Sequence, residues 1–279
     1  MQPTIRRPAV AGSWYPGSAS AIVAEIEGYL GGAGASAPEG RLVGLVSPHA
    51  GLRYSGPVAA CGYSLLRGRS GLTVVLVGPS HHYAFKGAAL WSRGAFETPL
   101  GTAPIDEDLA AALMAADAEW IVEGPRAHQD EHSLEMQLPF LQHLVADLQL
   151  VPCLMGSQSR AEVDALATAL AQAVPTARRP VLLVASSDLS HYHPAPVANR
   201  MDALVVDDVA RLDSERLMAR LEESHEHACG GGPIVAVMKA ARALGASCAA
   251  VLRYADSGDA GERDKSRVVG YVSAALLAA

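Results

Sequence analysis

The sequence has few aromatic residues, few cysteines and no long apolar run. Aromatic residues make up only 5% of the 279 positions, and the 3 phenylalanines are outnumbered by 10 histidines. No segment approaches the roughly 18 consecutive apolar residues of a membrane-spanning helix, and no apolar run follows the N-terminal arginines as it would in a signal peptide. The 4 cysteines form no CxxC pair, which favours reduced thiols in a cytoplasmic protein over a disulfide framework.

The sequence also lacks any extended cluster of acidic or of basic residues. The chain carries 22 basic and 29 acidic side chains, for a formal net charge of −7, with no block of like charge. This distribution argues against a nucleic-acid-binding surface. Half of the residues are hydrophobic, which argues against intrinsic disorder. We therefore expect a cytoplasmic protein with a substantial core that binds neither nucleic acid nor membrane.

Apolar, strand-like segments alternate with helix-like segments along the chain. This alternation predicts an α/β fold with a central mixed, mostly parallel sheet and helices on both faces, as a single domain over residues 1–279. The predicted strands are 42–46, 73–77, 148–154, 181–185, 249–254 and 268–275. The predicted helices are 18–30, 55–66, 106–116, 134–146, an Ala-rich helix between 154 and 181, 197–211 and 234–244.

Histidines follow three of the predicted strands. They are His49 in SPHAG, His81 in GPSHH and His191 in SSDLSH. In open α/β sheets the ligand crevice lies at the carboxyl ends of the strands. His49 and His81 are separated by about the length of one βαβ unit, so we expect them side by side on neighbouring strands.

A cysteine precedes one of the predicted helices. Cys229 is followed by three glycines and by Pro233, which suits a first helical turn. A helix N-terminus favours the thiolate, the form that binds metals. The glycines allow close backbone approach or an unusual turn, and they could also cradle an anion. One histidine beside a strand is more often structural than a ligand, but three of them together with Cys229 indicate a metal site.

Further side chains are candidates for the surroundings of this site or for a substrate pocket. The segment HQDEHSLE supplies Glu131 and His132, and His82 follows His81 directly. Trp14 and Tyr54 are candidate pocket residues, although Trp14 could equally anchor the N-terminal segment. We expect His128 and His225 at the surface, and Cys61 and Cys153 in the core.

Six motifs occur together: AGSWYPG, PHAG-x-x-YSG, GPSHH, DEHSLEMQLPF, SSDLSH and ACGGGPI. With them the chain resembles the Memo family, whose bacterial and archaeal members are called AmmeMemoRadiSam system protein B. The resemblance implies a fold similar to class III, LigB-type extradiol dioxygenases. It implies metal ligands at His49, His81 and Cys229, with His191 as acid–base catalyst beside Asp188. It also implies two protein partners, an Ammecr-type protein and a radical SAM protein.

Two positions depart from the animal members of the family. Gly231 and Gly232 stand where those proteins have Arg-His, and Leu52 stands where they have tyrosine. These differences predict a wider and less basic pocket. The substrate of the animal members is therefore a poor guide to the substrate of this chain. Two imidazoles and a thiolate suit Fe(II), copper and Zn(II) alike, and the dioxygenase-like fold favours Fe(II).

Three functions are compatible with these residues. The first is a metal-dependent oxidoreductase acting on a small molecule, in which His191 moves protons and Asp188 orients it. The second is a non-catalytic scaffold for a phosphopeptide or for the two protein partners. The third is a hydrolase with Cys229 as nucleophile, His191 as its base and Asp188 as the orienting group.

Overall fold

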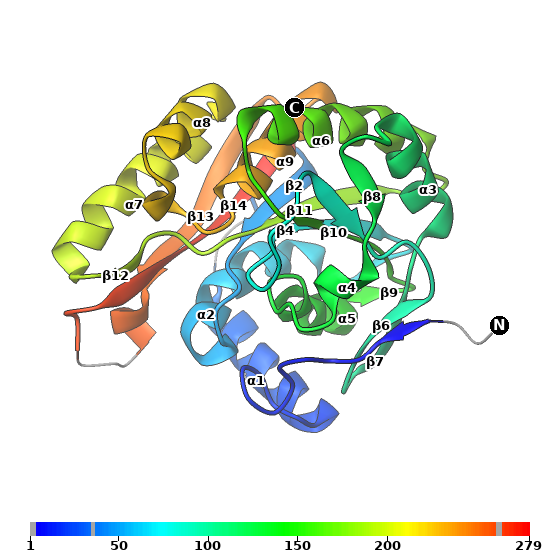
Figure 1. The fold of residues 1–279 in the computed structure, drawn as a ribbon. Coiled ribbons are helices and arrows are strands. Elements are labelled where there is room, and N and C mark those ends of the chain that lie inside the picture. Colours follow the sequence, from blue (N-terminus) through cyan, green and yellow to red (C-terminus); the bar gives the residue numbers. More distant parts are fainter. Residues whose placement is uncertain (1–3, 35–36, 261–263) are drawn as a thin grey trace.

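The computed structural model describes residues 4–34, 37–260 and 264–279 (Figure 1). The helices are α1 (Ala19–Gly32), α2 (Leu52–Tyr63), α3 (Glu107–Ala116), α4 (Pro125–His128), α5 (Leu138–Leu144), α6 (Arg160–Ala173), α7 (Ala195–Ala210), α8 (Ser214–Glu223) and α9 (Gly231–Ala243). The strands are β1 (Ile5–Arg6), β2 (Arg41–Ser47), β3 (Arg69–Ser70), β4 (Thr73–Pro79), β5 (Ala88–Leu90), β6 (Ala95–Thr98), β7 (Gly101–Pro104), β8 (Ile121–Glu123), β9 (Val145–Ala146), β10 (Gln149–Met155), β11 (Val181–Ser186), β12 (His191–His193), β13 (Cys248–Asp256) and β14 (Val268–Ala278). Within this part of the chain, no helix combines the length and apolarity that a membrane span requires.

A nine-stranded sheet forms the centre of the molecule. Its strand order is β12-β14-β2-β11-β4-β10-β5-β8, with β13 paired to β14. Strands β2, β11, β4 and β10 run parallel, whereas β14 pairs antiparallel with β2 and β5 pairs antiparallel with β10. The predicted mixed α/β sheet is confirmed, and its longest parallel part is these four central strands.

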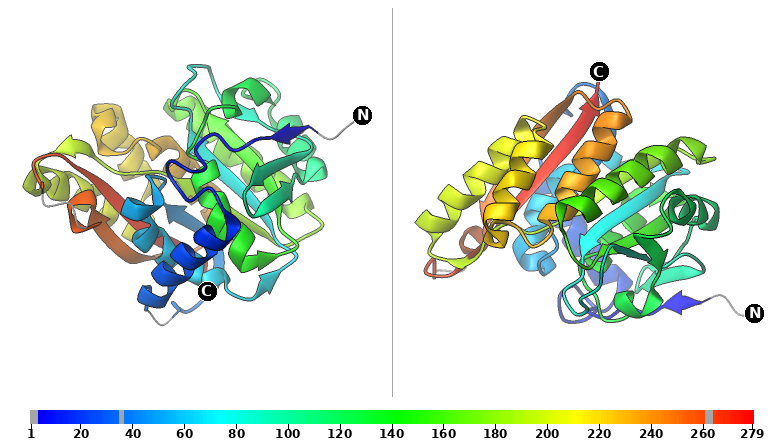
Figure 2. Two further views of the ribbon diagram at one scale, coloured as in Figure 1. Left: turned by 90° about the horizontal axis from the view of Figure 1, so that it is seen from below. Right: turned by 45° about the horizontal axis from the view of Figure 1, so that its top comes forward.

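Helices cover both faces of the sheet (Figure 2). The alternation of side chains along β2 shows how this arises, because successive residues of a strand point to opposite faces. A Cβ placed on Gly44 would lie 3.5 Å from Val237 of α9, whereas a Cβ on Gly62 of α2 would lie 3.6 Å from Leu45. Strands buried on both faces read as continuous apolar runs, and β4 is buried along its whole length.

Most of the predicted elements are present, with some corrections. The segment predicted as one helix over 134–146 is a 3-10 turn, η2 (Glu135–Gln137), followed by the short helix α5 with Pro139 in its first turn. Helices α4 and α8 and the short strands β1, β3, β5, β6, β7, β8, β9 and β12 were not predicted. The expectation that His49 and His81 follow neighbouring strands is wrong, because β11 lies between β2 and β4.

The N-terminal segment is held against the turn η2 by a buried ion pair. The Arg6 guanidinium pairs with the carboxylate of Glu135, and both side chains are almost fully buried. Arg6 also donates to the backbone oxygens of His128, at 3.0 Å, and Glu131, at 2.5 Å. Glu135 additionally accepts from the Tyr15 hydroxyl at 2.7 Å and from backbone N–H groups of residues 9 and 10. Charge-assisted hydrogen bonds therefore fasten the segment 6–15 to η2 and to the loop before it.

Replacing Arg6 by Met should destabilise the protein by about 3–5 kcal/mol, because it leaves the buried Glu135 carboxylate without its compensating charge. Arg7→Met is the matched control, since Arg7 pairs with Glu97 at the surface and its side chain is 75% exposed. We expect that variant to lose less than about 1 kcal/mol. Urea unfolding of the wild type and the two variants measures both losses of stability. Equal losses in Arg6→Met and Arg7→Met would contradict the stabilising role of the buried Arg6–Glu135 pair.

Candidate metal centre

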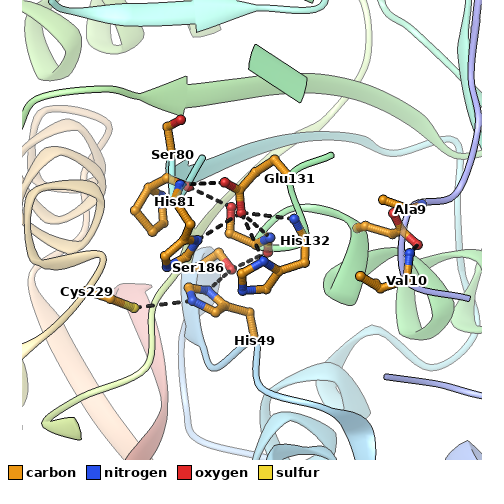
Figure 3. A network of polar contacts seen from close by, with 12 residues as sticks. Ala9, Val10, His49, Ser80, His81, Glu131, His132, Ser186 and Cys229 are labelled. Carbon is orange, nitrogen blue, oxygen red and sulfur yellow. Dashed lines mark hydrogen bonds and ion pairs between the residues drawn. The ribbon is translucent and has the colours of Figure 1, made fainter. Parts of the chain in front are cut away.

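Three histidine rings converge at the carboxyl ends of the central strands (Figure 3). His49 follows β2, His81 follows β4, and His132 lies in the loop before η2. The ring centroids of His49 and His81 are 5.3 Å apart, and those of His81 and His132 are 4.5 Å apart and stacked. The two strand-end histidines thus meet across the end of β11 although their strands are not neighbours.

Each ring of this histidine cluster (His49, His81 and His132) offers one ligand nitrogen, and these nitrogens lie within 4.8 Å of one another. The burial of the three residues is graded, from buried His49 through half-buried His132 to exposed His81. A group of three nitrogens at this spacing can face one ion, and the gradient leaves one side of it open to solvent.

His49 is enclosed by polar partners on both ring nitrogens. Its Nδ1 lies 2.9 Å from Ser186 Oγ, and its Nε2 lies 3.2 Å from Cys229 Sγ. Burial, and secondarily the neighbouring imidazoles, hold the pKa of His49 well below its ordinary value. The ring is therefore neutral at pH 7, the form in which a histidine binds metal.

His81 and His132 are both held by the buried carboxylate of Glu131. Its two oxygens accept from the His81 backbone N–H at 2.5 Å, from His81 Nδ1 at 2.9 Å, from the His132 N–H at 2.9 Å and from the Ser133 N–H at 2.8 Å. Burial would raise the pKa of Glu131, but the hydrogen bonds and charge of His81 outweigh it and hold that pKa below its usual range. The ionised carboxylate directs His81 Nε2 away from itself and into the cluster.

Cys229 approaches the cluster from the side of His49. Its sulfur contacts His49. Among the described residues, the group of ligand atoms within 4.8 Å of one another contains the three histidines and not Cys229. Burial, followed by the negative charge of Asp188, raises the pKa of the Cys229 thiol. The expectation that the helix N-terminus lowers this pKa is therefore wrong, because desolvation of the thiolate outweighs the helix dipole.

The glycines after Cys229 serve close packing. A Cβ on Gly230 would lie 2.4 Å from the Ser186 carbonyl oxygen, which no side chain can accommodate. The Gly232 N–H donates to Gln158 Oε1 at 2.7 Å, and Gln158 Nε2 donates to the Cys229 carbonyl at 2.8 Å. The expected close backbone approach is confirmed at Gly230. The Gly232 N–H, a donor that an anion cradle could use, is already bonded to Gln158.

The Asp188 carboxylate is hydrogen-bonded to the loop that carries His49. Asp188 Oδ1 accepts from the backbone N–H groups of His49, at 2.8 Å, and Ala50, at 3.3 Å. Burial raises the pKa of Asp188 to about 7. The His191 ring is hydrogen-bonded to the Leu189 carbonyl, and burial lowers its pKa. Asp188 thus positions the loop that carries His49.

A cleft of about 850 Å³ opens from the histidine cluster. Trp14 and Tyr54 line it as expected, together with His191, Asp188, Tyr192 and Arg267. The Trp14 ring lies against His132 with centroids 4.3 Å apart, so the N-terminal segment forms one wall. His82 is exposed, with its ring 6.3 Å from that of His132, and it is not among the residues that line the cleft.

The sequence-based prediction missed two residues of this region and misplaced a third. Gln137 and Ser186 are fully buried behind His49. Their motifs gave no signal for this, because Gln137 falls within an apolar helical pattern and Ser186 ends a strand. His128, expected at the surface, is 1% exposed, with Nε2 donating to the Ala89 carbonyl at 2.9 Å.

Comparisons with known proteins agree with the motifs. The sequence model described as "Memo-like protein" matches residues 6–275. A MEMO1 family protein of Methanothermobacter thermautotrophicus is 37% identical over 278 residues, covering 96% of this chain and 98% of the relative. MEMO1 family proteins of Sulfolobus acidocaldarius and Thermotoga neapolitana are 37% and 36% identical, and cover 96% and 98% of this chain and 98% and 99% of the relatives.

Among solved structures, the fold is similar to that of an uncharacterized protein, JW3007, from Escherichia coli K12. The TM-score is 0.57 at 16% sequence identity, and the match covers 85% of this chain and 100% of that chain. At this identity the similarity concerns the α/β fold alone.

The buried His128 predicts a pH-dependent stability. Burial lowers its pKa to about 4, so between the ordinary value near 6.5 and pH 4 the unfolded chain binds a proton that the folded chain does not. Stability should therefore fall as the pH drops through this window. At about 1.4 kcal/mol per pKa unit, His128 contributes about 3 kcal/mol to the loss.

His128→Phe removes this titration while filling the space beside the rings of Trp91 and Phe96. Urea unfolding at pH 7 and at pH 4 should show that the variant loses about 3 kcal/mol less than the wild type between the two values. An identical loss in both proteins would show that His128 is not the titrating group.

Proposed function

The chain belongs to the Memo-like protein family, and we propose that it is a metal-binding protein with a divalent transition metal held by His49, His81 and Cys229 beside a cleft for a small molecule. The observation that carries this proposal is the histidine cluster, whose three ligand nitrogens lie within 4.8 Å of one another. It lies at the carboxyl ends of parallel strands, where open α/β sheets bind their ligands.

The donor set fits such an ion. The pKa of His49 is held down by burial, and burial also lowers that of His132 to about 4, so both rings have a free lone pair at pH 7. The Glu131 carboxylate bonded to His81 Nδ1 is the kind of support that orients a metal-binding imidazole and raises its basicity.

Two side chains compete for the third ligand position. His132 belongs to the cluster, whereas Cys229 contacts His49 Nε2 at 3.2 Å. We favour Cys229, because a thiolate binds Fe(II), copper and Zn(II) strongly once a metal replaces its proton. Its raised pKa then makes metal binding dependent on pH. His132, packed against Trp14, would remain at the cleft wall.

The surrounding residues suit an oxidoreductase with a small-molecule substrate. A bound metal supplies Lewis acidity and, as iron or copper, one-electron redox chemistry; the resemblance to dioxygenases favours Fe(II). His191 lines the cleft with a lowered pKa, so its neutral ring can accept a proton from a bound molecule. Trp14 and Tyr54 supply apolar surface for that molecule.

Protein prepared without oxygen should bind about one Fe(II) per chain, as expected for a single site with three protein ligands. His81→Ala should reduce the bound iron to background, since it removes a ligand from the cluster. His143→Ala is the matched control, because this histidine pairs with Glu27 on another part of the molecule. Elemental analysis after gel filtration measures the stoichiometry.

The outcome for the other two side chains tests the ligand assignment. We expect Cys229→Ala to lose the iron and His132→Ala to retain it. Retention by Cys229→Ala with loss by His132→Ala would overturn the assignment of Cys229 in favour of three histidines. Metal at background level in the wild type, with no change in Cys229→Ala, would overturn the metal-binding function.

The close contact between Cys229 Sγ and His49 Nε2 also favours a second candidate, a hydrolase with a cysteine nucleophile. In this case the base that contacts the sulfur is His49, not His191 as expected from the sequence. The raised pKa of the thiol opposes this function, since the thiolate is the nucleophile.

Alkylation of the metal-free protein by iodoacetamide near neutral pH separates the two candidates. Cys248 is exposed and serves as an internal reference in the same chain. Because burial disfavours the Cys229 thiolate, we expect Cys229 to react at least about tenfold more slowly than Cys248. Faster alkylation of Cys229 than of Cys248, together with hydrolase activity that needs no metal, would favour the hydrolase.

A further inference from the structure

A row of three fully buried polar side chains leads to His49 from behind. The row consists of Tyr63 at the end of α2, Gln137 in η2 and Ser186 at the end of β11, each 0% exposed. The Tyr63 hydroxyl donates to Gln137 Oε1 at 2.6 Å, and Gln137 Nε2 donates to Ser186 Oγ at 2.8 Å. Ser186 Oγ in turn lies 2.9 Å from His49 Nδ1.

The amide of Gln137 has one possible orientation. Its nitrogen lies 3.0 Å from the carbonyl oxygen of Pro48, which can only accept a hydrogen bond. If the amide were turned over, two oxygens would face each other there. The amide nitrogen therefore faces both Pro48 and Ser186, and its two hydrogens are used by these two acceptors.

The Ser186 hydroxyl is then determined as well. It accepts from Gln137, and its single hydrogen is donated to the Ser133 carbonyl oxygen at 2.6 Å, another group that can only accept. What remains on Ser186 Oγ is a lone pair that faces His49 Nδ1. A hydrogen bond at 2.9 Å forms there only if Nδ1 carries the hydrogen.

We propose that Gln137 is a positioning residue that sets the tautomer of His49 through Ser186, so that the Nε2 lone pair faces Cys229 and the cluster before any ion binds. Figure 3 shows Ser186 and Cys229 at different nitrogens of the ring. A neutral histidine otherwise populates both tautomers, and one of them has a hydrogen at the ligand nitrogen. The value of this arrangement for metal binding rests on the function proposed above; the tautomer itself does not.

The two strand-end histidines are thus oriented by chemically different partners. His81 is held by the carboxylate of Glu131, whereas His49 is held by a hydroxyl whose direction two backbone carbonyls determine. A neutral partner suits the more deeply buried of the two rings, since a second buried carboxylate would add a desolvation cost.

The tautomer can be read directly in the metal-free, reduced full-length protein. Long-range ¹H–¹⁵N correlation spectra distinguish an imidazole with hydrogen on Nδ1 from one with hydrogen on Nε2, and the missing signals of His49→Gln assign the ring. We expect His49 as the Nδ1–H form at pH 7. Observation of the Nε2–H form in the wild type overturns the proposal without any further variant.

Three variants test what sets the tautomer. Ser186→Ala and Gln137→Met each interrupt the row, so we expect both to gain a population of the Nε2–H form. Cys229→Ala removes the other partner of the ring and should keep the wild-type pattern. Ser273→Ala is the matched control, because this serine is equally buried and its hydroxyl has no partner among the described residues. Unchanged tautomers in both Ser186→Ala and Gln137→Met, or a changed one in Cys229→Ala, would overturn the proposal.

Competition of Zn²⁺ with a chromophoric chelator measures the consequence for binding. Loss of an orienting partner typically weakens a metal site by about 10- to 100-fold, so Ser186→Ala and Gln137→Met should both show such a loss, with Ser273→Ala unchanged. Wild-type affinity in both variants would overturn the positioning role. If the wild type binds no metal but its tautomer is the expected one, the proposed function fails and the assignment of the tautomer to Gln137 stands.

Discussion

Four hydrogen-bond donors converge on the buried carboxylate of Glu131, and the geometry of the histidine cluster depends on this convergence. One donor is the ring of His81, and three are the backbone N–H groups of His81, His132 and Ser133. The backbone oxygen of Glu131 accepts a hydrogen bond from Arg6, whose guanidinium also pairs with Glu135. The cluster and the N-terminal wall of the cleft are thus connected through one loop, and displacement of Glu131 would move both. Charge-assisted hydrogen bonds are strong enough, once buried, to hold such an arrangement in place.

Local patterns were sufficient to predict the six longest strands of the sheet and the position of His49 and His81 at strand ends. Apolar runs identify buried strands because both faces are covered, and polar residues directly after them, as at His49 and His81, lie at the carboxyl edge. Strand order was not predictable, because β11 is inserted between β2 and β4 by packing between distant segments that leaves no trace in either local pattern. The same holds for His128, whose polar neighbours in sequence suggested a surface loop although Trp91 and Phe96 pack around it.

The chemistry of individual groups was harder to predict than their positions. Cys229 was correctly placed ahead of α9, but the sign of its pKa shift follows from burial, which a sequence does not reveal. Asp188 was expected beside His191, and its bond to the backbone N–H of His49 was not foreseen. Gln137 was overlooked because a single buried amide within an apolar pattern looks like an exposed position of a helix. In each case the missing information was which groups become neighbours once water is excluded.

The position of β11 has a consequence for the order of assembly. His49 and His81 are close in sequence, but their rings meet only across the end of a strand that is synthesised about one hundred residues later. Contacts of such long sequence separation form late, since the entropy of closing the intervening loops must be overcome first. A nascent chain that contains both histidines but not yet β11 therefore cannot bring the two rings together. The proposed ion would bind only after the sheet has formed and would stabilise the folded chain, so metal binding would follow folding.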